Sequence, residues 1–236
     1  MDIRKPVYLL AGGRYTGRRM PDPLIQAVFD ESGTASPTIA YVGTANDDDK
    51  GFFDRVTGMF REMGARRVEH ALISPPKAGL KRAKTILQSA DIVFISGGDV
   101  EVGMQVLEEK RMVDFLSQLY QQGKPFFGLS AGSIMLAKEW VRWKDPDDNA
   151  TAELFPCLGF APVICDTHGE GEGWEELQAA LMLKQENARG YGIVSGTAIK
   201  VSPDGRVEAQ GGTVHQYIQR GTRVERGPDI IPIESN

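Results

Sequence analysis

The segment that most constrains this chain is Gly128-Leu129-Ser130-Ala131-Gly132, which joins the run 124–128 to the apolar run 133–137. A strand that ends in Gly-x-Ser-x-Gly and passes directly into a helix must turn sharply, and the turn lifts the serine hydroxyl above the edge of a sheet. Glycines leave room for such a turn where side chains would collide. The segment therefore predicts a nucleophilic Ser130 at a strand-to-helix elbow, with a plain Gly/Ser-rich connection as the alternative.

Strand-like and helical patterns alternate over the first 140 residues. We expect strands at 7–11, 38–42, 67–72, 92–96 and 125–128, and helices between Asp22 and Gly33 and over 52–63, 102–109 and 112–120. This alternation is typical of a parallel sheet covered by helices. The sequence predicts a three-layer α/β fold with a mostly parallel central sheet, in one domain over 1–226 followed by a C-terminal tail over 227–236.

The second half of the chain has a less regular pattern. The polar stretch 140–155 predicts a surface loop or a short strand, and a strand is expected at 160–165. A helix at 174–185 and several short strands from Gly192 onward follow, with a turn at Pro203-Asp204-Gly205.

Composition excludes several classes of protein. The net charge is −5 and no basic run is longer than a pair, which argues against a nucleic-acid partner. No apolar stretch approaches membrane-spanning length and no secretory signal is recognisable, so no membrane partner and a cytoplasmic location are expected. Cys157 and Cys165 have no companion metal-ligand spacing, and Ala11-Gly12-Gly13 lacks the third glycine of a dinucleotide fingerprint. We expect two buried thiols, no metal and no cofactor.

A serine nucleophile needs a base, and the chain has three histidines. His70 lies within an expected strand, where a satisfied or surface histidine is typical. His168 lies in a glycine-containing loop between a strand and a helix, a usual place for catalytic side chains. His215 lies late in the chain, where an α/β-hydrolase has its base. The residues alone leave the choice between His168 and His215 open.

A second glycine turn, Ser96-Gly97-Gly98-Asp99, ends the strand that precedes the elbow. Glycine lets backbone N–H groups approach a reacting carbonyl closely, so Gly97 and Gly98 are candidates for an oxyanion hole and for substrate binding. The alternative is an ordinary strand-to-helix turn in which Asp99 caps the helix. Both can hold at once.

These motifs, together with Leu154-Phe155-Pro156 and a histidine loop before a helix, resemble the dipeptidase E and cyanophycinase family of serine peptidases over most of the chain. The resemblance implies a flavodoxin-like fold related to class I glutamine amidotransferases. It also implies that Ser130 is the nucleophile, that His168 is the general base, and that Gly98 and Ala131 supply the oxyanion-hole N–H groups.

The resemblance further implies an acidic residue between the serine and the histidine. Asp145 is favoured, because its separation from Ser130 is similar to that in dipeptidase E, and a solvated turn is the alternative reading of its surroundings. The other acidic residues of this segment are Glu139, Asp147, Asp148 and Glu153.

Two positions depart from the family pattern. Ser195 stands where family members usually carry an acidic residue, and glutamates stand where arginines commonly follow the histidine. These glutamates are Glu170, Glu172, Glu175 and Glu176. Because acidic walls repel acidic ligands, a substrate with a free amine or a basic side chain fits better than an aspartyl peptide. The alternative is that the glutamates only line the first turn of the next helix. Asp99 and Glu170 are further candidates for substrate binding.

Together these observations predict a serine-type peptidase that hydrolyses small peptides, in the manner of a dipeptidase for aspartyl, isoaspartyl or related peptides. Two alternatives stay open: a non-catalytic binding or regulatory protein on the same fold, and an esterase of the α/β-hydrolase type that uses His215. A glutamine amidotransferase subunit is disfavoured, because serine is a poorer intrinsic nucleophile than cysteine. The expected partner is a small peptide, and a homodimer is left open.

Overall fold

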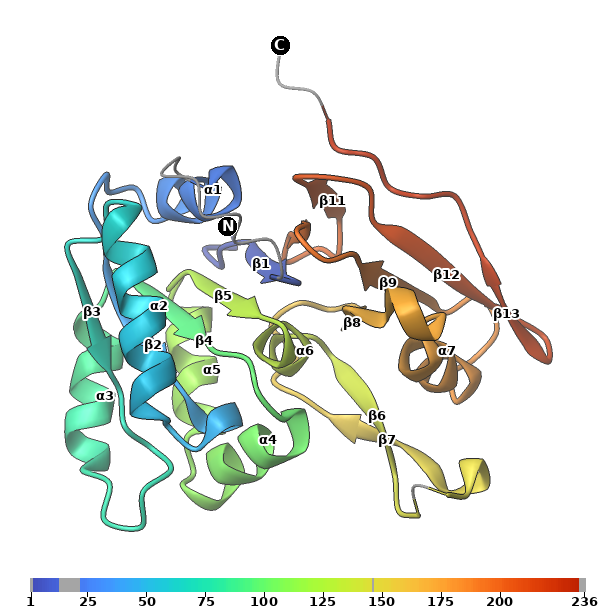
Figure 1. The fold of residues 1–236 in the computed structure, drawn as a ribbon, viewed down its shortest axis with the longest axis horizontal. Coiled ribbons are helices and arrows are strands. Elements are labelled where there is room, and N and C mark those ends of the chain that lie inside the picture. The colour runs from blue at the N-terminus through green and yellow to red at the C-terminus, as the bar shows by residue number, and fades with distance from the viewer. Residues whose placement is uncertain (1, 13–21, 146, 234–236) are drawn as a thin grey trace.

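Parallel strands form the centre of the largest sheet in the computed structural model, which describes residues 2–12, 22–145 and 147–233 (Figure 1). Its seven strands within these ranges have the order β11-β10-β1-β5-β4-β2-β3. Strands β1 to β5 pair in parallel, and β10 and β11 extend one edge antiparallel. The strands are β1 (Val7–Leu10), β2 (Thr38–Val42), β3 (Arg67–His70), β4 (Ile92–Ile95), β5 (Phe126–Leu129), β10 (Ala198–Val201) and β11 (Val207–Gln210).

Helices cover both faces of this sheet. Helices α1 (Pro23–Glu31) and α2 (Lys50–Glu62) pack on one face, where Val56 and Phe60 lie one helical turn apart and enter the same core. The other face is covered by α3 (Leu80–Ser89), α4 (Val100–Glu109), α5 (Val113–Gln121) and α6 (Ala131–Leu136). The expected three-layer fold with a mostly parallel sheet is therefore confirmed.

Helix α3 has no counterpart among the expected helices. It begins after Gly79 without a side-chain cap, so the usual start signal is missing. Its buried stripe is short and consists of Ala83, Ile86 and Leu87. Packing of this stripe against the sheet, which is a tertiary contact, therefore stabilises the helix in place of a local start signal.

The strand expected at 160–165 was placed too early. Strand β8 runs over Ile164–Thr167, whereas Phe160 and Ala161 enter the core from a bend. The Ala161 N–H donates to the carbonyl of Leu136, at the end of α6. The apolar residues at 160 and 161 therefore form the buried part of a connection and not a strand.

A second sheet has the order β13-β12-β9-β8 in the described residues. Its strands are β8, β9 (Arg189–Ile193), β12 (His215–Arg220) and β13 (Arg223–Arg226), and β8 and β9 are parallel. Helix α7 (Glu175–Met182) packs against it through Leu177 and Leu181. The stretch expected to be a loop or short strand forms the hairpin of β6 (Glu139–Trp143) and β7 (Ala152–Pro156).

Three backbone hydrogen bonds attach other segments to the end of β1. The Ser130 N–H donates to the Leu10 carbonyl at 2.8 Å, and the Ala11 N–H donates to Thr197 at 3.1 Å. The Gly196 N–H donates to the Gly12 carbonyl at 2.5 Å. The residue after β5 and the turn after β9 are thus both attached to the end of β1.

The C-terminal segment also contacts the second sheet. Ile230 pairs with Val214 through reciprocal backbone hydrogen bonds of 3.0 and 2.9 Å. The division into a domain over 1–226 and a tail stays a prediction. Gly13, quoted above for the first glycine turn, lies outside the described residues.

Candidate active site

Ser130 occupies a strained turn between β5 and α6. Its backbone has φ 53° and ψ −123°, a conformation that costs a non-glycine residue on the order of 1–3 kcal/mol. A Cβ on Gly128 would stand 2.4 Å from the carbonyl oxygen of Gly132, and a Cβ on Gly132 would stand 2.1 Å from that of Ile95. Both glycines of the motif are therefore sterically required. The turn leaves Ser130 half-buried at the edge of the central sheet.

The Gly97-Gly98 turn after β4 lies against Ser130. A Cβ on Gly97 would stand 3.3 Å from the Ser130 Cβ and 3.9 Å from its Oγ. Gly98 has φ 146°, and a Cβ there would stand 1.9 Å from the Ala45 carbonyl oxygen. Within residues 2–12, 22–145 and 147–233, neither the Gly98 N–H nor the Ala131 N–H has a hydrogen-bond acceptor. Two N–H groups are thus available beside the serine.

Asp99, a candidate for substrate binding, caps helix α4. Its Oδ1 accepts a hydrogen bond of 2.9 Å from the Val102 N–H. Asp99 therefore has the helix-capping role that the sequence analysis gives as the alternative.

His168 is exposed and follows β8 directly, with φ 65°. Its Nδ1 lies 3.0 Å from the Ser195 Oγ, and the Ser195 N–H donates to the Glu170 carboxylate at 2.6 Å. Burial raises the pKa of Glu170, but the hydrogen bonds from Ser195 and the nearby His168 outweigh burial and hold the pKa below its ordinary value. Because Gly196 is bonded to Gly12, this histidine and Ser130 stand at the same edge of the fold.

Asp145 lies in the exposed turn of the β6–β7 hairpin, which extends away from the central sheet in Figure 1. Its carboxylate accepts the Asp147 N–H at 3.1 Å, and its own N–H donates to the Thr151 hydroxyl. Among the described residues, the hydrogen bond of the His168 ring joins it to Ser195 and not to Asp145. Other acidic residues of this segment have partners of their own: Glu139 pairs with Lys184 beyond α7, Glu153 with Arg142 and Lys144, and Asp148 accepts the Ala150 N–H.

The two remaining histidines have carboxylate partners elsewhere. The His70 Nε2 lies 3.0 Å from Asp48, and its ring stacks on Phe53. The His215 Nδ1 lies 3.1 Å from Asp229, on β12 of the second sheet. His70 is the satisfied histidine that its strand position predicts.

Asp166 is a buried carboxyl group that the sequence analysis missed. It lies on β8, two positions before His168, and burial together with the Glu176 carboxylate raises its pKa to about 7. The signal was present, because an aspartate interrupts the otherwise uncharged strand 164–167.

Residues 2–12, 22–145 and 147–233 hold neither a cluster of metal-ligating side chains nor a membrane-spanning helix. These ranges contain no group of three or more His, Cys, Asp or Glu side chains able to hold a metal ion. No helix in the same part of the chain is long and apolar enough to cross a membrane.

The fold and the residues at the Ser130 edge of the central sheet define an α/β protein with a serine at a strained strand-to-helix turn. The family model for peptidase family S51 matches residues 7–208, so the chain belongs to peptidase family S51. This membership supports peptide-bond hydrolysis as the class of activity.

Individual relatives agree with this class. The chain is 22% identical over 168 residues to the uncharacterized peptidase YgaJ of Bacillus subtilis, which covers 71% of this chain and 70% of the relative. It is 26% identical over 129 residues to Peptidase E of Haemophilus influenzae, and the matched region covers 51% of this chain and 59% of the relative. The crystal structure of a peptidase from an acI-B1 actinobacterium shares the fold, with a TM-score of 0.67, 14% identity and 97% coverage of each chain.

Proposed function

We propose that this chain is a serine-type peptidase that hydrolyses small peptides through an acyl-enzyme on Ser130. The observation that carries the proposal is the strained turn at Ser130, packed against the Gly97-Gly98 loop. Backbone strain concentrates at functional sites, where it is part of the mechanism. A structural serine in a plain turn has no need of this conformation.

His168 is the general base in this proposal. Because Nδ1 contacts the Ser195 Oγ, Nε2 is the ring nitrogen that accepts the Ser130 proton. The Ser130 oxygen then bonds to the peptide carbonyl carbon, the C–N bond breaks, and the imidazolium returns the proton to the leaving amine. Water hydrolyses the resulting ester by the same steps, which regenerates the Ser130 hydroxyl.

In this proposal Glu170 has the role that the family resemblance implies for Asp145. Ser195 orients the imidazole but carries no charge, whereas the Glu170 carboxylate is bonded to the Ser195 N–H. A carboxylate held ionised beside the ring stabilises the imidazolium that forms during catalysis. Asp145 would have to leave its own hairpin turn to do the same.

The Gly98 and Ala131 N–H groups receive the oxyanion in this proposal. They flank Ser130 from two different turns, and neither is consumed by a hydrogen bond among the described residues. Donors fixed in place before the reaction need no reorganisation when negative charge develops on the carbonyl oxygen.

The surroundings of His168 favour a substrate that carries a positive charge. Burial raises the pKa of Glu176, and the Glu172 and Asp99 carboxylates raise it further, which indicates that these acidic groups lie close together. Burial and the Glu176, Glu172 and Glu170 carboxylates likewise raise the pKa of Asp166. Because like charges repel and opposite charges attract, a peptide with a free amine or a basic side chain fits this edge better than an aspartyl or isoaspartyl peptide.

The experiment is a dipeptide hydrolysis assay with four proteins: wild type, Ser130→Ala, His168→Ala and His215→Ala. The panel contains basic, neutral, aspartyl and isoaspartyl dipeptides. We expect the first two variants to lose hydrolysis and His215→Ala, the matched histidine control, to keep it. Full activity of Ser130→Ala would refute the proposal, and loss in His215→Ala alone would favour the esterase alternative.

A further inference from the structure

A short turn after β2 supports the Gly97-Gly98 loop from behind. This turn, η1, spans Thr44–Asn46, and the Asp99 N–H donates to the Ala45 carbonyl at 2.7 Å. Gly98 is packed so tightly against Ala45 that it has no room for a side chain. The loop beside Ser130 therefore takes part of its shape from η1.

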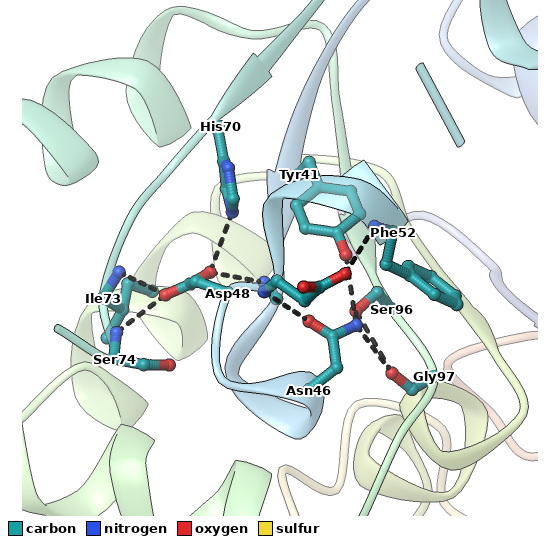
Figure 2. Close-up of polar contacts among 11 residues, drawn as sticks. Tyr41, Asn46, Asp48, Phe52, His70, Ile73, Ser74, Ser96 and Gly97 are labelled. Carbon is teal, nitrogen blue, oxygen red and sulfur yellow. Dashed lines mark hydrogen bonds and ion pairs between the residues drawn. The ribbon is translucent and has the colours of Figure 1, made fainter. Parts of the chain in front are cut away.

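Both the NH₂ group and the oxygen of the Asn46 side-chain amide form hydrogen bonds (Figure 2). Its Nδ2 donates to the Gly97 carbonyl at 2.9 Å and to the Ser96 Oγ at 2.8 Å, and the Tyr41 hydroxyl lies 3.2 Å away. Its Oδ1 accepts the Asp49 N–H at 3.2 Å. These partners define which end of the amide faces the loop, because only the NH₂ end can donate to the Gly97 carbonyl.

Asp48 fixes the turn that carries Asn46. Its buried carboxylate accepts the N–H groups of Gly43, Ile73 and Ser74 and contacts the His70 Nε2 at 3.0 Å. Burial alone would raise the pKa of Asp48, but His70 and the Ser74 and Ile73 N–H groups hold it below its ordinary value. Figure 2 shows the contacts from His70, Ile73 and Ser74 meeting at the Asp48 carboxylate. Asn46 therefore stands on a rigid support.

The orientation of a peptide group is defined once either its C=O or its N–H is held by a hydrogen bond. In a trans peptide, the C=O of one residue and the N–H of the next point to opposite sides. When the Gly97 carbonyl is bonded to Asn46, the Gly98 N–H is turned away from η1. Ser130 packs against the same peptide through Gly97.

We propose that Asn46 is a positioning residue that holds the Gly97 carbonyl and thereby aims the Gly98 N–H at the oxyanion formed on Ser130. This inference rests on the proposed function. Without the Asn46 donor, the Gly97 carbonyl loses its shorter hydrogen bond and keeps the 3.4 Å bond from the Ser96 hydroxyl, and glycines at both positions give the peptide freedom to rotate. Asn46 itself touches neither substrate nor reacting atoms.

The test is the rate at which a fluorophosphonate phosphonylates Ser130, followed by intact mass over a range of reagent concentrations. The variants are Asn46→Ala, which removes the amide, and Asn46→Asp, which keeps its shape but loses the donor. The same two substitutions at Asn149, exposed in the hairpin, are the matched controls. Thermal unfolding of each protein is measured in parallel.

We expect both Asn46 variants to react about 10- to 100-fold more slowly at saturating reagent. This loss is smaller than the roughly 100- to 1000-fold loss on removing an oxyanion donor itself, because the Gly98 N–H is still present. The half-saturating reagent concentration is expected to stay unchanged, because Asn46 does not contact the reagent. The Asn149 variants are expected to react at the wild-type rate.

A wild-type maximal rate in Asn46→Asp would overturn the inference, and so would a change confined to the half-saturating concentration. If Asn46→Ala fails to fold, the isosteric Asn46→Asp decides alone. Failure of the wild-type protein to react is a different result, because it contradicts the proposed function itself.

Discussion

Replacing Asp166 by asparagine should change how stability depends on pH. In the folded protein, burial and the Glu176 carboxylate raise the pKa of Asp166 from 3.8 to about 7. Between these values the folded carboxyl keeps its proton while the unfolded one has lost it. The unfolded state is therefore favoured progressively as the pH rises from about 4 to about 7. Above pH 7 the Asp166 carboxyl is ionised in both states, so its destabilising effect on the folded protein no longer changes with pH.

The size of this effect follows from the shift. A shift of about 3 pKa units corresponds to about 4 kcal/mol, at about 1.4 kcal/mol per unit. Asparagine has the shape of the protonated carboxyl and does not ionise. Relative to wild type, Asp166→Asn should thus gain about 4 kcal/mol of unfolding free energy between pH 4 and pH 8.

The assay is guanidinium unfolding of both proteins at pH 4, 5, 6, 7 and 8, with Asp30→Asn as an exposed aspartate control. The difference between Asp166→Asn and wild type should grow with pH and level off above 7. A difference that is the same at pH 4 and pH 8 would refute the reasoning, because Asp166 would then ionise alike in both states.

Two further predictions concern packing and thiol chemistry. Gly132→Ala should lower the free energy of unfolding by about 3 kcal/mol or more, because its Cβ would stand 2.1 Å from the Ile95 carbonyl oxygen. Gly58 lies at an exposed position of α2, where a Cβ meets no other atom, so Gly58→Ala should raise the free energy of unfolding by about 0.5–1 kcal/mol. Chemical unfolding measures both changes. Equal effects of the two changes would contradict the steric argument. Burial raises the pKa of Cys157 to about 12 and raises that of Cys165 well above its ordinary value, so a thiol reagent at pH 8 should modify neither until the protein unfolds. Stoichiometric modification of the native protein would show that these thiols are accessible.

The sequence predicts the parts of this protein that depend on local patterns. The turn at Ser130 follows from two glycines that flank one serine, although the carbonyl group that excludes a side chain at Gly132 belongs to Ile95 on β4. The central strands follow from short apolar runs, and their boundaries are within a few residues of those expected. Helix α3 was missed because its start has no side-chain cap and its apolar stripe is short.

Contacts between distant segments could not be predicted in this way. His168 meets Ser195 because β8 and β9 pair in parallel, which brings together residues 27 positions apart. Asn46 and the Gly97 carbonyl are 51 positions apart and meet at the ends of β2 and β4. The fold creates both contacts, so spacing along the chain carries no signal for them.

The most direct test of the central claim is whether Ser130 is an activated nucleophile. Wild-type protein, Ser130→Ala and His168→Ala are incubated with a fluorophosphonate and weighed intact, and the modified peptide is sequenced. The account predicts one adduct on Ser130 in the wild type, none in Ser130→Ala and little or none in His168→Ala. An unmodified wild-type protein, or an adduct that persists in Ser130→Ala, would contradict it.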